Sequence, residues 1–457
     1  MSTARTIFSL ASDTVFNSCT FRTQQSQRPD RSPLAFLYLV SIRKRRMRHY
    51  WFPIRKLFKK HEMEPWKKIL YISWGIVFFH SIGMSMISPF LPLYLKELGI
   101  ADARVQSLWS GVIIGITPLF SGLMAPFWGT ISDKYGRRPL ILRSTFGISF
   151  FVLLMSFATD VYQLLALRIL HGTCGGVLPA FTALVAFNLP EEKTGEGIGI
   201  LQSAVYSGTI IGPFLGGLCS DWFGYRNVLF LISALTLIAG IATVLFIHEP
   251  KRDPAQARST ILNNLKLVLG TANLRLLVVI ILAIQFSLFL VQPILPLFIV
   301  SLAGSGESAT MVGLVFSVTG FSTLLFAPYW GKAGDKRGHE NVLSRNLLWA
   351  GLVFLPQALV TSAFQLLPLR ALLGFFIAGI VPTLQTLIVK NTKDAERGGV
   401  LGITHSVHAF GHALGPLAGG MVGAACGYRW AIALTSLLLL LFWFLFRNFM
   451  MKNERGA

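Results

Sequence analysis

One sequence pattern occurs twice in this chain of 457 residues, and each copy lies between two long apolar stretches. The copies are 202 or 203 positions apart, since Ala125 in the first corresponds to Ala327 in the second and Gly224 corresponds to Gly427. The corresponding segments are Ala125-Pro-Phe-Trp-Gly129 and Ala327-Pro-Tyr-Trp-Gly331, Arg168 and Arg370, Gly172 and Gly374, and Gly224-Tyr-Arg226 and Gly427-Tyr-Arg429. A match at a fixed spacing is the mark of an internal repeat. The repeat therefore predicts two structurally similar halves.

The composition places both halves in a lipid bilayer. Hydrophobic residues make up 53% of the chain and charged residues 13%, which is roughly half the usual charged fraction of a soluble protein. A water-soluble fold could not bury that much apolar surface, whereas a helical bundle in a membrane exposes it to lipid. Duplicated hydrophobic halves are typical of secondary transporters, which bind their substrate where the halves meet.

Twelve apolar runs are each long enough to cross roughly 30 Å of hydrocarbon as a helix. They lie at 69–95, 108–130, 140–158, 162–188, 198–220, 227–247, 274–302, 309–330, 342–361, 365–389, 399–423 and 430–449. We therefore expect an all-α polytopic membrane protein with twelve transmembrane helices in two six-helix halves. The expected divisions are an N-terminal extension (1–62), a first bundle (63–247), a linker (248–273), a second bundle (274–449) and a tail (450–457).

The basic residues are sorted by loop. The net charge is +21, but one set of alternate loops carries nearly all the lysines and arginines near the spans, and the other set carries only Lys96, Arg104, Arg226 and Arg429. Loops rich in Lys and Arg stay in the cytoplasm. The pattern predicts a multi-pass protein of the cytoplasmic (inner) cell membrane with both termini and the linker in the cytoplasm. It argues against nucleic-acid binding, which needs a single basic patch or stripe.

The first 62 residues follow a different composition, rich in Arg, Ser and Gln. Their apolar run at 34–40 is too short to span a membrane. Three interpretations remain open: a disordered cytoplasmic tail, an organelle transit peptide, or an over-extended start of translation. We favour the last, because Met63-Glu-Pro-Trp-Lys-Lys68 leads directly into the first helix, as a natural bacterial start does.

The loop after the second expected helix runs from Gly129 to Pro139 and reads GTISDKYGRRP. It resembles the signature loop of the major facilitator superfamily, and this resemblance implies the major facilitator fold with a conformational latch at the cytoplasmic side. The latch residues would be Gly129, Asp133, Gly136, Arg137 and Arg138, with Asp335 in the second copy. An Asp at the membrane boundary can pair with a loop Arg and face a helix N-terminus, where negative charge is favoured. For Arg138 the alternative is that it only orients the loop.

The fourth expected helix contains Arg168, followed three residues later by His171. An ionised group inside an apolar span is costly and suggests a functional role by default. The stretch also resembles the superfamily's second motif, in which this arginine is tied to proton coupling. The alternative is a packing arginine that binds a backbone carbonyl.

The fifth expected helix contains Gly208, Gly212, Pro213, Gly216 and Gly217. This pattern resembles the motif of the exporting antiporters in the superfamily, and it implies membership of the twelve-helix drug:proton antiporter group. Glycines at four-residue spacing also give a flat face for close helix packing. Because the eleventh expected helix repeats the pattern at 411–420, duplication and packing account for part of it.

Many proton-coupled drug exporters place an Asp or Glu inside a helix of the first half, and no expected span of this chain contains one. Histidines are the titratable alternative, because imidazole titrates near neutral pH. The candidates for proton coupling are Arg168, His171, His80 and His408, and those for the substrate cavity are Met84, Gln285, Gln292, Gln385, His405, His408 and His412. The last three share one face of the eleventh expected helix, where lining the cavity is favoured over direct protonation.

Together these features predict a secondary transporter that exports small lipophilic compounds by proton antiport, with alternating access. A dedicated exporter or importer of a single metabolite, such as a sugar or a siderophore, is the alternative. No catalytic or nucleotide-binding motif indicates an enzyme. We expect no cofactor besides the proton gradient and no metal, since the four cysteines lack metal-ligand spacing. The expected partners are a lipophilic small molecule, protons and the bilayer, and the expected state is a monomer.

Overall fold

The computed structural model describes residues 64–87, 89–190, 193–247, 261–303, 309–392 and 396–456. The chain divides into two compact units, Met1–Met63 and Glu64–Ala457, and every described residue belongs to the second. The interpretations of the N-terminal extension, and the part of the expected linker at 248–260, therefore lie outside the described residues.

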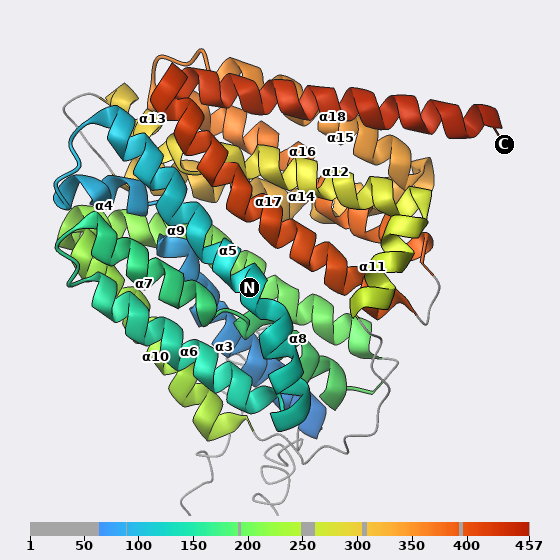
Figure 1. Ribbon diagram of the computed structural model, residues 1–457, viewed down its shortest axis with the longest axis horizontal. Coiled ribbons are helices and arrows are strands. Elements are labelled where there is room, and N and C mark those ends of the chain that lie inside the picture. Colours follow the sequence, from blue (N-terminus) through green and yellow to red (C-terminus); the bar gives the residue numbers. More distant parts are fainter. Residues whose placement is uncertain are drawn as a thin grey trace, which may run out of the picture. The chain divides into compact units, whose positions relative to one another are not determined.

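All the regular elements in these ranges are helices (Figure 1). The first half contains α3 (Pro65–Ile87), α4 (Leu91–Glu97), α5 (Ala103–Tyr135), α6 (Arg137–Met155), α7 (Val161–Thr173), α8 (Val177–Asn188), α9 (Thr194–Phe223) and α10 (Tyr225–Phe246). The second half contains α12 (Ala272–Leu290), α13 (Ile294–Ala303), α14 (Ala309–Arg337), α15 (His339–Gln357), α16 (Ala363–Lys390), α17 (Arg397–Cys426) and α18 (Tyr428–Gly456). Between the halves, the helix α11 (Ile261–Gly270) lies inside the expected linker.

Ten stretches of the described chain are helical, long and apolar enough to cross a membrane. They correspond to ten of the twelve expected spans. The other two are α15 and α17, helices of 19 and 30 residues that carry several charged or polar side chains and many glycines. Both are packed among the remaining helices, α15 against α16 and α18, and α17 against α5 and α12. The expected all-α polytopic membrane fold is confirmed.

Three expected spans are interrupted. The span at 69–95 is divided between α3 and α4 just before Pro89, and the span at 274–302 is divided between α12 and α13 at Pro293. Proline lacks a backbone N–H and disfavours helical continuation. The span at 162–188 is divided between α7 and α8 at Gly176, whose φ of 113° suits glycine far better than any other residue. Its counterpart in the second half, α16, is unbroken.

The tryptophan of the repeated motif makes the same contact in both halves. Trp128 Nε1 donates a hydrogen bond of 2.8 Å to the carbonyl oxygen of Thr173. Trp330 Nε1 donates one of 2.6 Å to the carbonyl oxygen of Phe375. In each half this bond ties the helix that carries the tryptophan to the helix that carries the buried arginine. The repeat in the sequence is therefore a repeat of tertiary contacts.

The arginine of the repeated Gly-Tyr-Arg motif also has equivalent partners. Arg226 Nη2 donates to the carbonyl oxygen of Ala158 at 3.2 Å. Arg429 Nη1 and Nη2 donate to the carbonyl oxygens of Ala358 and Val360 at 2.7 and 2.9 Å. Both arginines donate to carbonyl groups just beyond the end of a helix, α6 or α15. Carbonyl groups at a helix end have no hydrogen-bond partner within the helix, and the arginines supply one.

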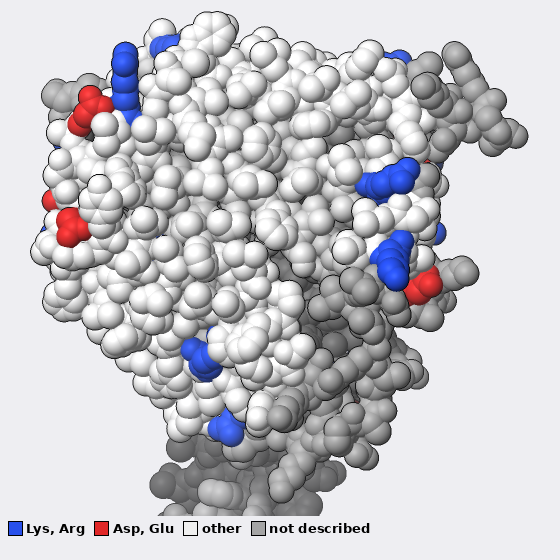
Figure 2. Space-filling model, in the orientation of Figure 1, with Lys and Arg blue, Asp and Glu red and all other residues white. Residues whose placement is uncertain are grey.

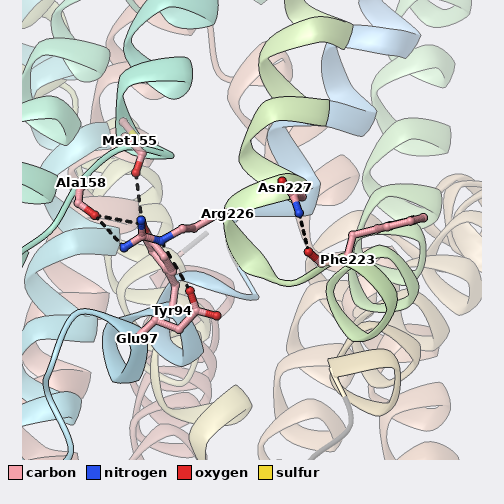
Figure 3. A network of polar contacts seen from close by, with 7 residues as sticks. All are labelled: Tyr94, Glu97, Met155, Ala158, Phe223, Arg226 and Asn227. Atoms are coloured by element: carbon pink, nitrogen blue, oxygen red, sulfur yellow. Dashed lines mark hydrogen bonds and ion pairs between the residues drawn. The ribbon is translucent and has the colours of Figure 1, made fainter.

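Figure 3 shows the first of these arginines with its neighbours. The Tyr94 hydroxyl donates to the carbonyl oxygen of Met155 at 3.3 Å, beside the Arg226 contact. Glu97 lies 3.9 Å from Arg226 Nε, and both side chains are close to half exposed. Burial raises the pKa of the Glu97 carboxyl, while the positive charge of Arg226 opposes that rise. Exposed ion pairs contribute little to stability. The hydrogen bond from Arg226 to the carbonyl oxygen of Ala158 is therefore the main polar link between α10 and the end of α6.

The helices run between two ends of the bundle. The Gly224 end carries the turns at Gly224 and Gly427, and the Gly136 end carries the turns at Gly136 and Gly338. Figure 2 shows a broad surface without Lys, Arg, Asp or Glu, with charged side chains near its margins. Such an uncharged surface suits contact with the hydrocarbon core of a bilayer.

Candidate functional site

The two halves contact each other chiefly through two helix pairs, α5 with α17 and α9 with α14, and α13 makes smaller contacts with α4 and α5. In the first pair, a Cβ atom at Gly111 would lie 2.5 Å from the carbonyl oxygen of Pro416. In the second, a Cβ atom at Gly217 would lie 2.5 Å from the carbonyl oxygen of Ala309. The obstacles are backbone atoms, so these crossings require glycine.

These close contacts lie toward the Gly224 end of the four helices. Toward the Gly136 end, a Cβ atom at Gly129, Gly199, Gly331 or Gly402 would meet no atom within 4 Å. One of these glycines lies on each of α5, α9, α14 and α17. The described parts of the two halves are therefore packed tightly at one end and loosely at the other.

The glycines of the α9 motif serve two different interfaces. Gly208, Gly212 and Gly216 face α3 of the same half, and a Cβ atom at Gly208 would lie 2.5 Å from Ser81 Cβ. Gly217 faces α14 of the other half, where the carbonyl oxygen of Pro213 also approaches that helix at Gly313. Close packing alone thus explains why these positions are glycines. The direction of transport that the motif implies stays a prediction.

Arg168 is buried on α7, with 5% of its surface exposed. Its Nε donates a hydrogen bond of 3.0 Å to the carbonyl oxygen of Ile113 on α5. In the opposite direction, the Thr117 hydroxyl of α5 donates to the carbonyl oxygen of Arg168 at 3.0 Å. The carbonyl contact that we kept as the alternative role of Arg168 therefore exists, but it uses one nitrogen of the guanidinium.

Two histidines lie near this arginine, and a third lies near one of them. The charge of Arg168 is within interaction range of His171 on α7 and of His412 on α17, and His80 of α3 is within range of His171. The Nδ1 atoms of His80 and His171 are buried and have no hydrogen-bond partner among the described residues. The structure thus brings together a buried cation and three titratable rings from three helices, one of them in the second half. This group, Arg168, His80, His171 and His412, is called the arginine–histidine cluster.

The remaining α17 histidines lead away from this cluster toward the Gly136 end. His412 stacks on Phe289 of α12 with ring centroids 3.7 Å apart, and His408 meets the same ring edge-on at 6.5 Å. The charge of His405 is in turn within range of His408. Gln285 of α12 is buried and lies against α17 at Gly411. The expected stripe of histidines is therefore present, with one aromatic ring and one amide beside it.

Three other candidates lie elsewhere. Met84 is half-buried and packs against the core of the first half. Gln292 is in the turn between α12 and α13 instead of inside a helix, because the expected span is interrupted there. Gln385 is an exposed residue of α16. These three do not join the arginine–histidine cluster in the described contacts.

The signature loop makes its described contacts within the first half. Gly136 forms the turn with a φ of 95°, which favours glycine. The Arg137 guanidinium lies 5.2 Å from the ring centroid of Phe187 on α8, and Arg138 Nη2 donates to the carbonyl oxygen of Val244 on α10 at 2.9 Å. The side chain of Asp133 is not among the described ones, so the latch that it would form stays a prediction.

In the second copy, Asp335 is bound locally. Its Oδ1 lies 3.4 Å from His339 Nε2, and its side chain is 76% exposed. Its described partner thus belongs to the next helix of the same half.

Arg143 is a contact residue that the sequence did not single out. Arg143, on α6, donates to the carbonyl oxygens of Thr173, Cys174 and Gly175 at 3.2, 3.3 and 2.8 Å. Its guanidinium also lies 3.4 Å from the ring centroid of Trp128. Arg143 therefore satisfies the carbonyl groups freed where α7 ends. The adjacent glycines 175 and 176 were the sequence signal for this interruption.

Comparison with known proteins identifies the family. The family model described as Major Facilitator Superfamily matches residues 73–307 and 277–456, which together cover most of the chain. This chain belongs to the major facilitator superfamily. The resemblance of the signature loop to this superfamily is thereby confirmed.

Two curated members of the superfamily show how similar its relatives are. The multidrug resistance protein MdtG of Proteus mirabilis is 39% identical over 373 residues, which cover 80% of this chain and 91% of the relative. MdtG of Yersinia enterocolitica is 35% identical over 404 residues, which cover 86% of this chain and 96% of the relative. The similarity thus extends over nearly the whole of each relative.

Solved structures of the superfamily share the fold at low sequence identity. The nucleoside transporter NupG has a TM-score of 0.69 at 14% identity and covers 84% of this chain and 99% of its own. A bacterial homologue of the human lysosomal transporter Spinster, solved inward-facing and occupied, has a TM-score of 0.69 at 15% identity and covers 84% of this chain and 98% of its own. The expected major facilitator fold is confirmed.

Proposed function

We propose that this superfamily member is a secondary active transporter that exports small lipophilic compounds in exchange for protons, by alternating access. The observation that carries the proposal is the unequal packing of the two halves, tight at the Gly224 end and loose at the Gly136 end. A bundle that can exchange these two arrangements exposes a central site to one side at a time. The name of the relatives, multidrug resistance protein, supports drug-like substrates.

The proposed orientation places the Gly136 end in the cytoplasm. That end carries the basic loop residues, including Arg137, Arg138 and Lys336, whereas few lysines or arginines lie at the Gly224 end. Positive charge is retained on the cytoplasmic side. Both termini and the linker are then cytoplasmic, the protein sits in the inner membrane, and the arrangement described here is open toward the cytoplasm.

The arginine–histidine cluster is the proposed site of proton coupling. Its histidines can gain and lose a proton, because imidazole titrates near neutral pH. Since His412 belongs to this cluster and stacks on Phe289, a proton on the cluster and a drug on the same surface would compete, so that proton entry favours drug release. His408, Gln285 and the Phe289 ring extend the same surface and are the proposed contacts for an apolar, partly polar substrate.

The remaining elements of the proposal follow from this cycle. The signature loop, with Gly129, Asp133 and Gly136, would hold the Gly136 end closed in the opposite arrangement of the halves. The energy source is the proton gradient, without a further cofactor. One chain contains both halves, so a monomer is sufficient.

Uptake of ethidium into energised inverted membrane vesicles tests the proposal. We expect wild-type vesicles to accumulate ethidium and an uncoupler to abolish that accumulation, because the pump then lacks its driving force. His408→Ala should reduce accumulation, since it removes a ring from the proposed substrate surface. If folded protein moved no lipophilic compound and an uncoupler had no effect, the alternative of a dedicated transporter for one metabolite would replace this proposal.

A further inference from the structure

A carboxylate at the Gly224 end joins the two halves. Asp221 lies in the last turn of α9, in the first half. Its Oδ1 accepts a hydrogen bond of 2.8 Å from the backbone N–H of Ala309. Its Oδ2 accepts bonds from the backbone N–H and the hydroxyl of Thr310, at 2.9 and 2.5 Å. Ala309 and Thr310 are the first two residues of α14, so Asp221 caps a helix of the other half.

The other carboxylate caps described at this end act within a single half. Asp102 accepts from the backbone N–H groups of Arg104 and Val105, at the start of its own helix α5. Asp160 accepts from those of Tyr162 and Gln163, at the start of its own helix α7. Caps of this kind survive any rigid movement of one half against the other. The Asp221 cap would be broken by such a movement, because its donors and its acceptor belong to different halves.

Three observations indicate that the Asp221 contact stabilises the closed arrangement of this end. A carboxylate at a helix N-terminus is bound by oriented N–H groups and favoured by the helix dipole. The neighbouring crossing is fixed by backbone contact, since a Cβ atom at Gly217, one turn away, would lie 2.5 Å from the carbonyl oxygen of Ala309. The equivalent crossing of α5 with α17 has a neutral bond instead, from the Ser107 hydroxyl to the carbonyl oxygen of Gly420 at 3.1 Å.

We infer that Asp221 is the gate residue that holds the Gly224 end closed during the transport cycle, by capping α14 across the two halves. The inference rests on the proposed alternating access, in which this end must open once per cycle. Opening breaks these three bonds between the halves, and closing restores them. Asp221 therefore sets the balance between the two arrangements without touching the substrate.

The distance between two spin labels at the Gly224 end tests this inference without drug or proton gradient. Phe157 and Leu359 are 60% and 73% exposed, lie in equivalent turns of the two halves, and can carry the labels in a cysteine-free background. We expect Asp221→Ala to raise the ratio of long to short distances roughly fivefold, the usual effect of losing a carboxylate cap. Asp221→Asn should give a smaller rise, because its amide oxygen still accepts one N–H.

Asp160→Ala is the matched control, since it removes a carboxylate cap at the same end within one half. It should lower thermal stability and leave the label distances as in wild type. The inference is overturned if Asp221→Ala and Asp221→Asn both keep the wild-type distances, or if Asp160→Ala shifts them equally. If Asp221→Ala shifted the label distances but wild-type protein exported no compound, the proposed function would be refuted and the role of Asp221 in closing this end would be supported.

Discussion

Replacing Gly217 with alanine is expected to slow export by roughly tenfold or more, while the protein still folds. The added Cβ atom would lie 2.5 Å from the carbonyl oxygen of Ala309 and 2.8 Å from the Cα atom of Thr310. These are backbone atoms of α14, which cannot rotate away as a side chain can. Overpacking of this kind costs about 1–3 kcal/mol, and about 1.4 kcal/mol corresponds to a factor of ten. The cost applies only when the Gly224 end is closed, so the variant should remain open at that end.

The matched control is Gly199→Ala on the same helix, where a Cβ atom would meet nothing within 4 Å. It should transport at the wild-type rate and be slightly more stable, since alanine favours a helix more than glycine does. Initial rates of ethidium transport and the thermal midpoint of both variants provide the comparison. Equal rates for Gly217→Ala and Gly199→Ala would show that closure of this end does not depend on the crossing.

Replacing Arg168 with alanine is expected to uncouple transport from the proton gradient. The substitution removes the buried charge that acts on His171 and His412, together with the bond to the carbonyl oxygen of Ile113. Without coupling, accumulation of ethidium against its gradient should fall to the level that wild type reaches in the presence of an uncoupler. Downhill movement of ethidium should persist, because both halves and their crossings are intact.

Two further variants separate charge from packing in this prediction. Arg168→Lys keeps a positive charge and should retain part of the uncoupler-sensitive accumulation. Arg370→Ala removes the repeat counterpart, which is also buried but has no partner for Nε and Nη2 among the described residues. It should keep coupling near the wild-type level. If Arg370→Ala uncoupled transport as strongly as Arg168→Ala, the special position of the arginine–histidine cluster would be refuted.

The hydropathy pattern was enough to predict the helices, because it reflects what each helix exposes to lipid. The repeat was enough to predict two similar halves. The repeated Trp128 and Trp330 indicated equivalent contacts, and the structure shows them as equivalent hydrogen bonds. Helices were also predicted correctly at α15 and α17, although these two are not among the ten stretches of the described chain that are long and apolar enough to cross a membrane.

The features that the sequence did not predict depend on contacts between segments that are far apart in the chain. The interruption at Gly176 is stabilised by Arg143, a residue of another helix, whereas the counterpart α16 continues unbroken. Asp221 and Ala309 are 88 positions apart, and no local pattern pairs them. The place of Gln292 in a turn depends on where α12 ends. Such features follow from the packing of the helices, which periodicity alone does not determine.

A disulfide across the Gly224 end tests the central claim most directly. Asp221 and Thr310 contact each other across the two halves, so Asp221→Cys with Thr310→Cys can be oxidised in a cysteine-free background to join α9 to α14. We predict that the oxidised protein transports no ethidium, that reductant restores transport, and that neither single variant responds to oxidation. Transport at an unchanged rate with the disulfide formed would contradict alternating access through this end.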